Sequence, residues 1–128
     1  MNDEPFALDH VQLAMPAGRE DAARKFYVEA LGFEEVPKPP ELAQRGGAWF
    51  RSGTVHIHLG VDPDFVSAKK AHPAFRCLHY DALLERLSKH GIALTPDTLP
   101  FDGKEHCYVA DPFGNRIEFI AERKERQR

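Results

Sequence analysis

The chain has 128 residues, of which 42% are hydrophobic and 29% charged, which is enough for one domain with a substantial hydrophobic core. Its net charge is −3 and its only basic run is residues 122–128, so we expect no nucleic-acid binding. No run of 18 apolar residues occurs and residues 1–4 are acidic, so we expect no membrane association and a cytoplasmic location.

The first half of the chain predicts a strand, a helix and three further strands. Alternating apolar residues predict a strand over 6–15, and helical spacing of apolar residues predicts a helix over 19–31 capped by Gly32. A short strand over 33–36 leads into a proline-rich loop that ends near Gly47. The half closes with strands 48–51 and 54–61, joined by a Ser52-Gly53 hairpin turn.

The second half repeats this order after a linker over residues 62–71. A strand over 74–80 precedes a helix over 81–89, for which Asp81 is the expected N-cap and Gly91 lies just past the end. The remaining predicted elements are a short strand over 92–94, a proline-rich loop over 96–103, and strands over 106–110 and 115–121 joined by the turn at 111–114.

The repeated order of elements indicates an internal duplication with a period of about 60 residues. We therefore expect a single α+β domain over residues 1–128. Its first module covers about 6–61 and its second about 72–122. Laid over each other, the modules set His10 on His72 and His58 on Glu118.

Four residues with metal-binding side chains thus occupy two pairs of equivalent positions. Imidazole nitrogens with one carboxylate suit zinc, iron(II), nickel or cobalt, and the carboxylate oxygen also allows manganese. We therefore predict a divalent metal site of His10, His58, His72 and Glu118. His56 shares a strand face with His58 and stays an alternative ligand, although the alignment favours His58.

The two cysteines, Cys77 and Cys107, are far apart and form no Cys-x-x-Cys motif, so neither a disulfide framework nor a thiolate zinc site is indicated. We expect both to be buried in the core.

Four segments resemble the vicinal oxygen chelate superfamily, which includes glyoxalase I, extradiol dioxygenases, fosfomycin-resistance transferases and bleomycin-resistance proteins. These segments are 8–11 (LDHV), 26–27 (FY), 31–33 (LGF) and, most specifically, 111–118 (DPFGNRIE). The resemblance implies two tandem βαβββ modules whose mixed sheets curl into a cup around a divalent metal. It also implies a homodimer.

Within that resemblance, His10, His72 and Glu118 match the family's ligand positions, and Glu118 is the expected catalytic residue. His58 departs from glyoxalase I, which usually carries glutamate there. A metal-bound imidazole is a poorer base than a carboxylate, so this departure weighs against lactoylglutathione lyase activity. An extradiol dioxygenase needs only two histidines and one carboxylate, with open positions for oxygen and catechol.

The resemblance therefore implies a metal-dependent enzyme acting on a small molecule with vicinal oxygens, either a lyase of the glyoxalase type or an oxidoreductase of the dioxygenase type. Two alternatives stay open: a metal-free protein that sequesters an antibiotic, and a regulatory or dimer-forming domain whose cup is filled by side chains. Strand parity adds Gln12 and Arg76 to the ligand-bearing face, where Arg76 is suited to a substrate carboxylate or phosphate. We expect Gln12, His56 and Arg76 to contact substrate.

Overall fold

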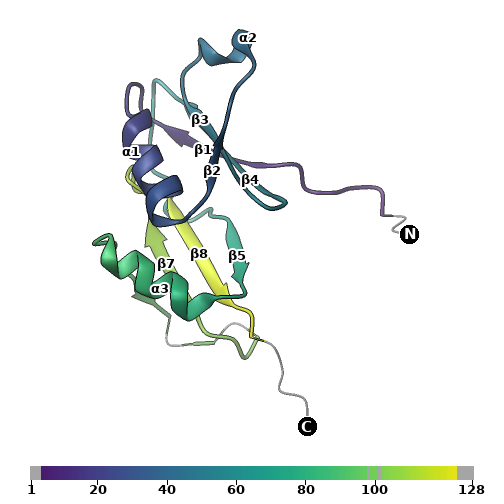
Figure 1. The fold of residues 1–128 in the computed structure, drawn as a ribbon, viewed down its shortest axis with the longest axis vertical. Helices are drawn as coiled ribbons and strands as arrows, with labels where there is room; N and C mark the ends of the chain where they lie inside the picture. Colours follow the sequence, from purple (N-terminus) through teal and green to yellow (C-terminus); the bar gives the residue numbers. More distant parts are fainter. Residues whose placement is uncertain (1–3, 98, 101, 124–128) are drawn as a thin grey trace.

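A computed structural model describes residues 4–97, 99–100 and 102–123, which form two four-stranded mixed sheets that do not close into a barrel (Figure 1). Most of the basic run predicted at the end of the chain lies outside these residues. The first sheet has the order β1-β4-β3-β2 and the second β5-β8-β7-β6. The strands are β1 (Val11–Met15), β2 (Glu34–Val36), β3 (Ala48–Ser52), β4 (Val55–Val61), β5 (Ala74–Cys77), β6 (Thr95–Pro96), β7 (His106–Ala110) and β8 (Arg116–Ala121).

The two sheets share strand order, strand direction and register, which confirms the predicted α+β fold with two similar modules. In each sheet the first and last strands along the chain pair in parallel, β1 with β4 and β5 with β8. The other neighbouring strands are antiparallel. Gln12 pairs with His58 in the first sheet, and Ala74 pairs with Glu118 in the second. Because Gln12 and Ala74 lie two residues after His10 and His72, the register reproduces the alignment read from the sequence.

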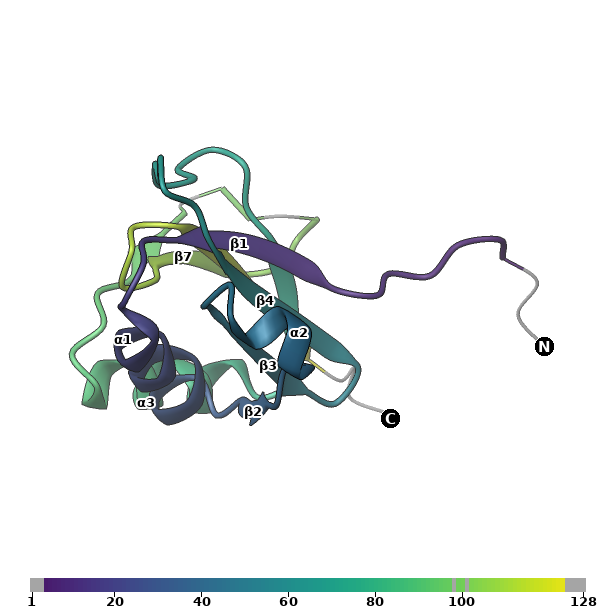
Figure 2. The same ribbon diagram turned by 90° about the horizontal axis from the view of Figure 1, so that it is seen from above.

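One helical segment in each module covers the same face of the sheets. The first, α1 (Glu20–Arg24), continues as a π-helix, η1 (Lys25–Ala30), where one helix over 19–31 was predicted. In the second module α3 (Tyr80–Lys89) takes the equivalent place, and Figures 1 and 2 show it on the same side of the molecule as α1. Gly32 and Gly91 follow the two helical segments with positive φ, as predicted.

The core lies between these helices and the sheets. Leu13, Ile57 and Leu59 supply its part in the first sheet, and Ile117 and Phe119 supply its part in the second. Since strand side chains alternate, the intervening polar residues face away from the helices. Within the part of the chain that the structure describes, no helix has the length and apolar character needed to cross a membrane. The cytoplasmic location stays a prediction.

Three predicted strands are shorter or absent. The strand predicted over 74–80 ends at Cys77, because the chain turns there and α3 begins at Tyr80. The strand predicted over 6–15 begins only at Val11, because the parallel register brings β1 past the start of β4 and leaves residues 4–8 with no opposing strand. This segment runs away from the body of the protein in both views (Figures 1 and 2). The strand predicted over 92–94 is also wrong: Ile92 and Leu94 pack on the core, and the edge strand forms at β6 instead.

Three local predictions also need correction. The proline-rich loop contains a short helix, α2 (Pro40–Ala43), which Pro40 can begin because its missing N–H would have no helical partner. Asp81 is not an N-cap, since α3 begins one residue earlier and the Asp81 side chain pairs with Arg123 at 2.8 Å. Both cysteines are free, but only Cys107 is buried and Cys77 is partly exposed.

A buried carboxylate joins the two modules at the turn before β8. Asp111 Oδ1 accepts the backbone N–H groups of Phe113 and Asn115, and Oδ2 accepts Tyr27 Oη–H at 2.7 Å and Asn115 Nδ2–H at 3.1 Å. Asn115 Nδ2 also donates to the carbonyl of Ala14 in β1, at 2.9 Å. Burial raises the pKa of Asp111, and the hydrogen bonds from Tyr27 and Asn115 oppose that rise. The hydrogen bonds of Asp111 and Asn115 therefore connect η1, β1 and the start of β8.

Replacing Tyr27 by phenylalanine removes one of these donors without changing the shape of the core. We expect Tyr27→Phe to lower the free energy of unfolding by about 1–3 kcal/mol, because a buried carboxylate loses a hydrogen bond. Urea unfolding followed by circular dichroism measures the change. Tyr108→Phe, in a partly exposed ring on β7, is the matched control and should be near neutral. Equal stability of the two variants would contradict a structural role for the Tyr27 hydroxyl.

Candidate metal centre

Glu118 is a buried carboxylate in the middle of β8. Its neighbours Ile117 and Phe119 point into the core, so strand alternation turns Glu118 to the opposite, open face of the second sheet. Only 7% of the residue is exposed. A buried carboxylate needs partners, because an isolated one would be strongly destabilising.

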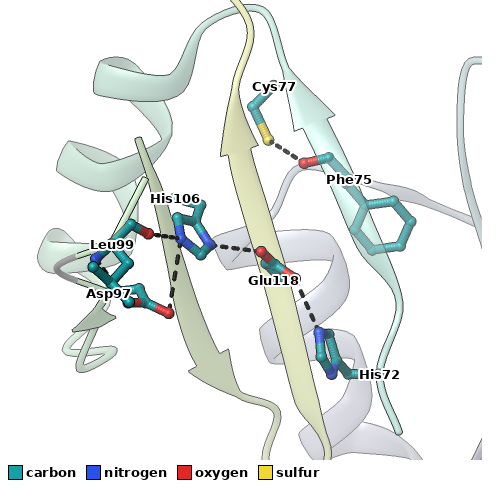
Figure 3. Close-up of polar contacts among 7 residues, drawn as sticks. All are labelled: His72, Phe75, Cys77, Asp97, Leu99, His106 and Glu118. Atoms are coloured by element: carbon teal, nitrogen blue, oxygen red, sulfur yellow. Dashed lines mark hydrogen bonds and ion pairs between the residues drawn. The ribbon is translucent and has the colours of Figure 1, made fainter. Parts of the chain in front are cut away.

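Two histidines on neighbouring segments supply those partners, as Figure 3 shows. His72 Nε2 lies 2.9 Å from Glu118 Oε1, and His106 Nδ1 lies 2.6 Å from Glu118 Oε2. His72 lies just before β5, and His106 begins β7, so the carboxylate sits between strands on both sides.

The second nitrogen of each ring faces a backbone carbonyl. His72 Nδ1 lies 2.7 Å from the carbonyl oxygen of Lys70, and His106 Nε2 lies 2.7 Å from that of Leu99. A carbonyl oxygen only accepts, so each of these nitrogens carries a proton. A neutral ring then has only a lone pair on the nitrogen that faces Glu118.

The charges of His72, His106 and Glu118 determine whether a proton or a cation can lie between their facing atoms. The pKa of His106 is raised, first by its hydrogen bond to the Leu99 carbonyl and further by Glu118, so His106 is the ring suited to pair with Glu118 as an imidazolium. His72 in its neutral form would direct the Nε2 lone pair at Oε1, and two facing lone pairs require a proton or a cation between them.

This geometry fits a divalent metal. Two ligand atoms that are each about 2.1 Å from one ion, roughly at a right angle, lie about 3.0 Å apart, close to the 2.9 Å between His72 Nε2 and Glu118 Oε1. The hydrogen bond from His72 Nδ1 to Lys70 holds the ring in the tautomer that a metal ligand needs. His72 and Glu118 are therefore placed as two ligands of one ion would be, and their role as metal ligands stays a prediction.

The other two predicted ligands lie together on the first sheet. The rings of His10 and His58 stack at 4.0 Å between centroids, and Trp49 stacks on the other side of His58 at 4.1 Å. Burial and then the nearby His10 and His56 lower the pKa of His58, which favours its neutral form. His10 Nδ1 lies 2.8 Å from Asp9, an arrangement that leaves His10 Nε2 available as a ligand. In-plane lone pairs of stacked rings run parallel, so both rings could hold one ion only after one of them turns.

The structure thus brings the predicted ligands together in two pairs. Among residues 4–97, 99–100 and 102–123 of a single chain, no three His, Cys, Asp or Glu side chains lie close enough to hold one metal ion. The four-ligand site stays a prediction that one copy of the chain does not complete.

The predicted substrate-contacting residues line two hollows beside His10. One, of about 540 Å³, lies on the open face of the first sheet and is lined by Gln12 and His56 together with His10, His58 and Trp49. The other, of about 580 Å³, lies between β1 and β5, and Arg76 lines it together with His10 and His56. Arg76 is exposed and weakly paired with Glu122 at 3.7 Å, which leaves it able to bind a substrate anion.

Sequence reasoning missed His106 as part of the site. The pattern indicated a strand from His106 onward, but the residue facing Glu118 depends on the register between β7 and β8, which the sequence does not show. Strand alternation puts His106 on the same face as Tyr108, the residue paired with Glu118. This alternation was the signal in the sequence that could have included His106 in the site.

Comparison with known proteins gives one family. The model of the Glyoxalase/Bleomycin resistance protein/Dioxygenase superfamily matches residues 7–119. No curated protein matches the chain.

Solved structures share the fold over nearly the whole chain. A protein from Bacillus anthracis, described as of the glyoxalase family, is 48% identical with a TM-score of 0.87, over 95% of this chain and 99% of that one. The fosfomycin resistance protein FosX from Listeria monocytogenes is 17% identical with a TM-score of 0.68, over 97% of both chains. The antibiotic binding protein TnmS3 from Streptomyces sp. CB03234 is 23% identical with a TM-score of 0.67, over 91% of this chain and 98% of that one. The last two are similar in fold alone.

Metal binding measured on single variants tests the ligand set. Loss of an outer-shell partner of a metal ligand weakens binding by about 10- to 100-fold. We expect Glu118→Gln to weaken Co²⁺ binding by more than this, because the amide removes the anionic donor itself. Isothermal titration of the untagged protein measures the dissociation constant. His58→Ala and His56→Ala form a matched pair, and a larger loss in His56→Ala would make His56 the ligand.

Proposed function

The chain belongs to the Glyoxalase/Bleomycin resistance protein/Dioxygenase superfamily, and we propose that it is a metal-dependent enzyme acting on a small molecule with vicinal oxygens. The observation that carries the proposal is the 2.9 Å approach of His72 Nε2 to Glu118 Oε1, because two ligand atoms of one divalent ion would lie at about this separation. The reaction would be of the glyoxalase or extradiol dioxygenase type.

His72 and Glu118 would hold the ion from the second module, and His10 would supply the third donor, with His58 beside it. A bound divalent ion would polarise two adjacent substrate oxygens as a Lewis acid. Two imidazoles and one carboxylate suit Zn, Ni, Fe(II), Mn or Co. Glu118 is the proposed catalytic residue, because a carboxylate beside the ion could take a proton from the bound substrate.

The surrounding residues suit a small polar substrate. Trp49 and Gln12 border the hollow on the first sheet, where an aromatic face and an amide can orient a small molecule. Arg76 and His56 border the groove between β1 and β5 and would attract an anionic substituent.

We further propose that the centre is completed in a homodimer, by the first module of one copy and the second module of the other. Each chain carries two donor pairs on different sheets, and no three donors meet among the described residues of one chain. The extended segment that ends at His10 exposes 86% of Phe6 and 82% of Leu8, apolar surface that a second copy would cover. β1 and β5 are edge strands of the two sheets, where a second copy could make the same contact.

A metal-free sequestering protein is the second candidate. The absence of a three-donor cluster within the described part of one chain favours it, and TnmS3, an antibiotic binding protein, shares the fold. In this case the hollows beside His10 would hold the antibiotic, and His72 and Glu118 would serve only as a buried ion pair.

A substrate panel separates these functions. For a dioxygenase, catechols added anaerobically to the Fe(II)-loaded protein should change its visible spectrum, and oxygen should then yield ring-cleaved product. For a glyoxalase, hemithioacetals should be isomerised with Ni²⁺ or Zn²⁺. Glu118→Gln is the control and should be inactive in either assay. No activity in either assay, together with tight binding of an antibiotic by the metal-free protein, would support sequestration instead.

Subunit mixing tests where the centre is built. A His10→Ala chain is mixed with a Glu118→Ala chain, the subunits are exchanged, and bound metal is measured. If sites are shared between chains, heterodimers have one site with every ligand, and random exchange restores about a quarter of all sites. Each variant alone is the control. No gain on mixing, with exchange verified by mass spectrometry, would place both halves of the centre in one chain.

A further inference from the structure

We propose that His106 is a positioning residue for Glu118: it binds one carboxylate oxygen and leaves the other as the only oxygen offered to the metal. This inference rests on the proposed metal-dependent function. It concerns a residue of β7 that is not among the predicted ligands and that acts through Glu118.

The contacts of His106 fix its ring on both sides. Nδ1 lies 2.6 Å from Glu118 Oε2, a short distance typical of a charge-assisted hydrogen bond, and Nε2 donates to the Leu99 carbonyl at 2.7 Å. Asp97 lies 3.8 Å from Nε2 and adds a second negative group beside the ring. Figure 3 shows Glu118 between His106 on one side and His72 on the other.

The direction of these contacts limits how Glu118 can bind an ion. Oε2 is engaged by His106, so Oε1, which faces His72 Nε2, is the oxygen available to a metal. The carboxylate is then a one-oxygen ligand whose rotation is prevented by a ring that is itself held by the Leu99 carbonyl. Such outer partners orient metal ligands and raise affinity.

The first module lacks this arrangement at the equivalent place. Tyr108 pairs with Glu118 as Trp49 pairs with His58, so the position two residues before each of them is His106 in one module and Gly47 in the other. Gly47 has no side chain to reach His58, and its N–H donates to Glu20. The histidine therefore occurs only in the module that carries the carboxylate, which agrees with a role directed at Glu118.

Two substitutions separate the contacts of His106. His106→Asn places an amide N–H where Nδ1 lies and keeps the donor to Glu118, whereas His106→Gln reaches toward the Leu99 carbonyl and loses the donor to Glu118. Co²⁺ is titrated into the full-length metal-free protein, and both the dissociation constant and the visible Co²⁺ spectrum are recorded. Thermal unfolding of the metal-free variants gives the stability of each fold.

We expect His106→Gln to weaken Co²⁺ binding by about 10- to 100-fold and to alter the Co²⁺ spectrum, because Glu118 becomes free to use both oxygens. His106→Asn should recover most of the affinity and the original spectrum. His90→Gln, at an exposed histidine after α3, is the control and should bind like the wild type.

The other outcomes each overturn the inference. Wild-type protein that binds no Co²⁺ would overturn the proposed function and this role with it. Wild-type binding with an unchanged affinity and spectrum in His106→Gln would overturn the positioning role alone. Equal losses in the Asn and Gln variants, or a loss of thermal stability with full affinity in both, would make His106 an anchor for the Leu99 loop.

Discussion

The fold depends on keeping one buried carboxylate, Asp111, fully hydrogen-bonded. Its oxygens accept bonds from the turn that follows it, from Tyr27 in η1 and from the Asn115 side chain, which also donates to β1. Losing any one of these would leave a charge poorly solvated in the core. The network therefore fixes where β8 begins, and strand alternation from that point turns Ile117 to the core and Glu118 to the open face.

The two modules keep one register but have different chemistry at equivalent places. In the first, His58 is partly buried between the rings of His10 and Trp49, and its lowered pKa favours an uncharged stack. In the second, the Glu118 carboxyl group lies between two imidazoles and contacts both. The duplicated scaffold thus carries stacked aromatic rings in one module and a carboxyl group between two imidazoles in the other, and the proposed metal centre would take donors from both.

The two pairs of predicted ligands lie apart in one chain, and this separation is the reason for proposing that a second copy completes the site. The sheets are open rather than closed into a barrel, and β1 and β5 are edge strands of the two sheets. Exposed Phe6 and Leu8 lie on the segment that carries His10 outward. Pairing with a second copy would cover this apolar surface and bring the two kinds of half-site together.

The sequence by itself determined the order of elements, the duplication and the equivalence of His58 with Glu118, because apolar periodicity and turn residues are local signals. It could not determine that His106 reaches Glu118, that the strand predicted from Phe6 begins only at Val11, or that the four predicted ligands separate into two pairs. Those outcomes depend on inter-strand register and on the placement of one sheet against the other. Both are set by contacts between residues far apart in the chain, such as Asn115 with Ala14, which no local pattern encodes.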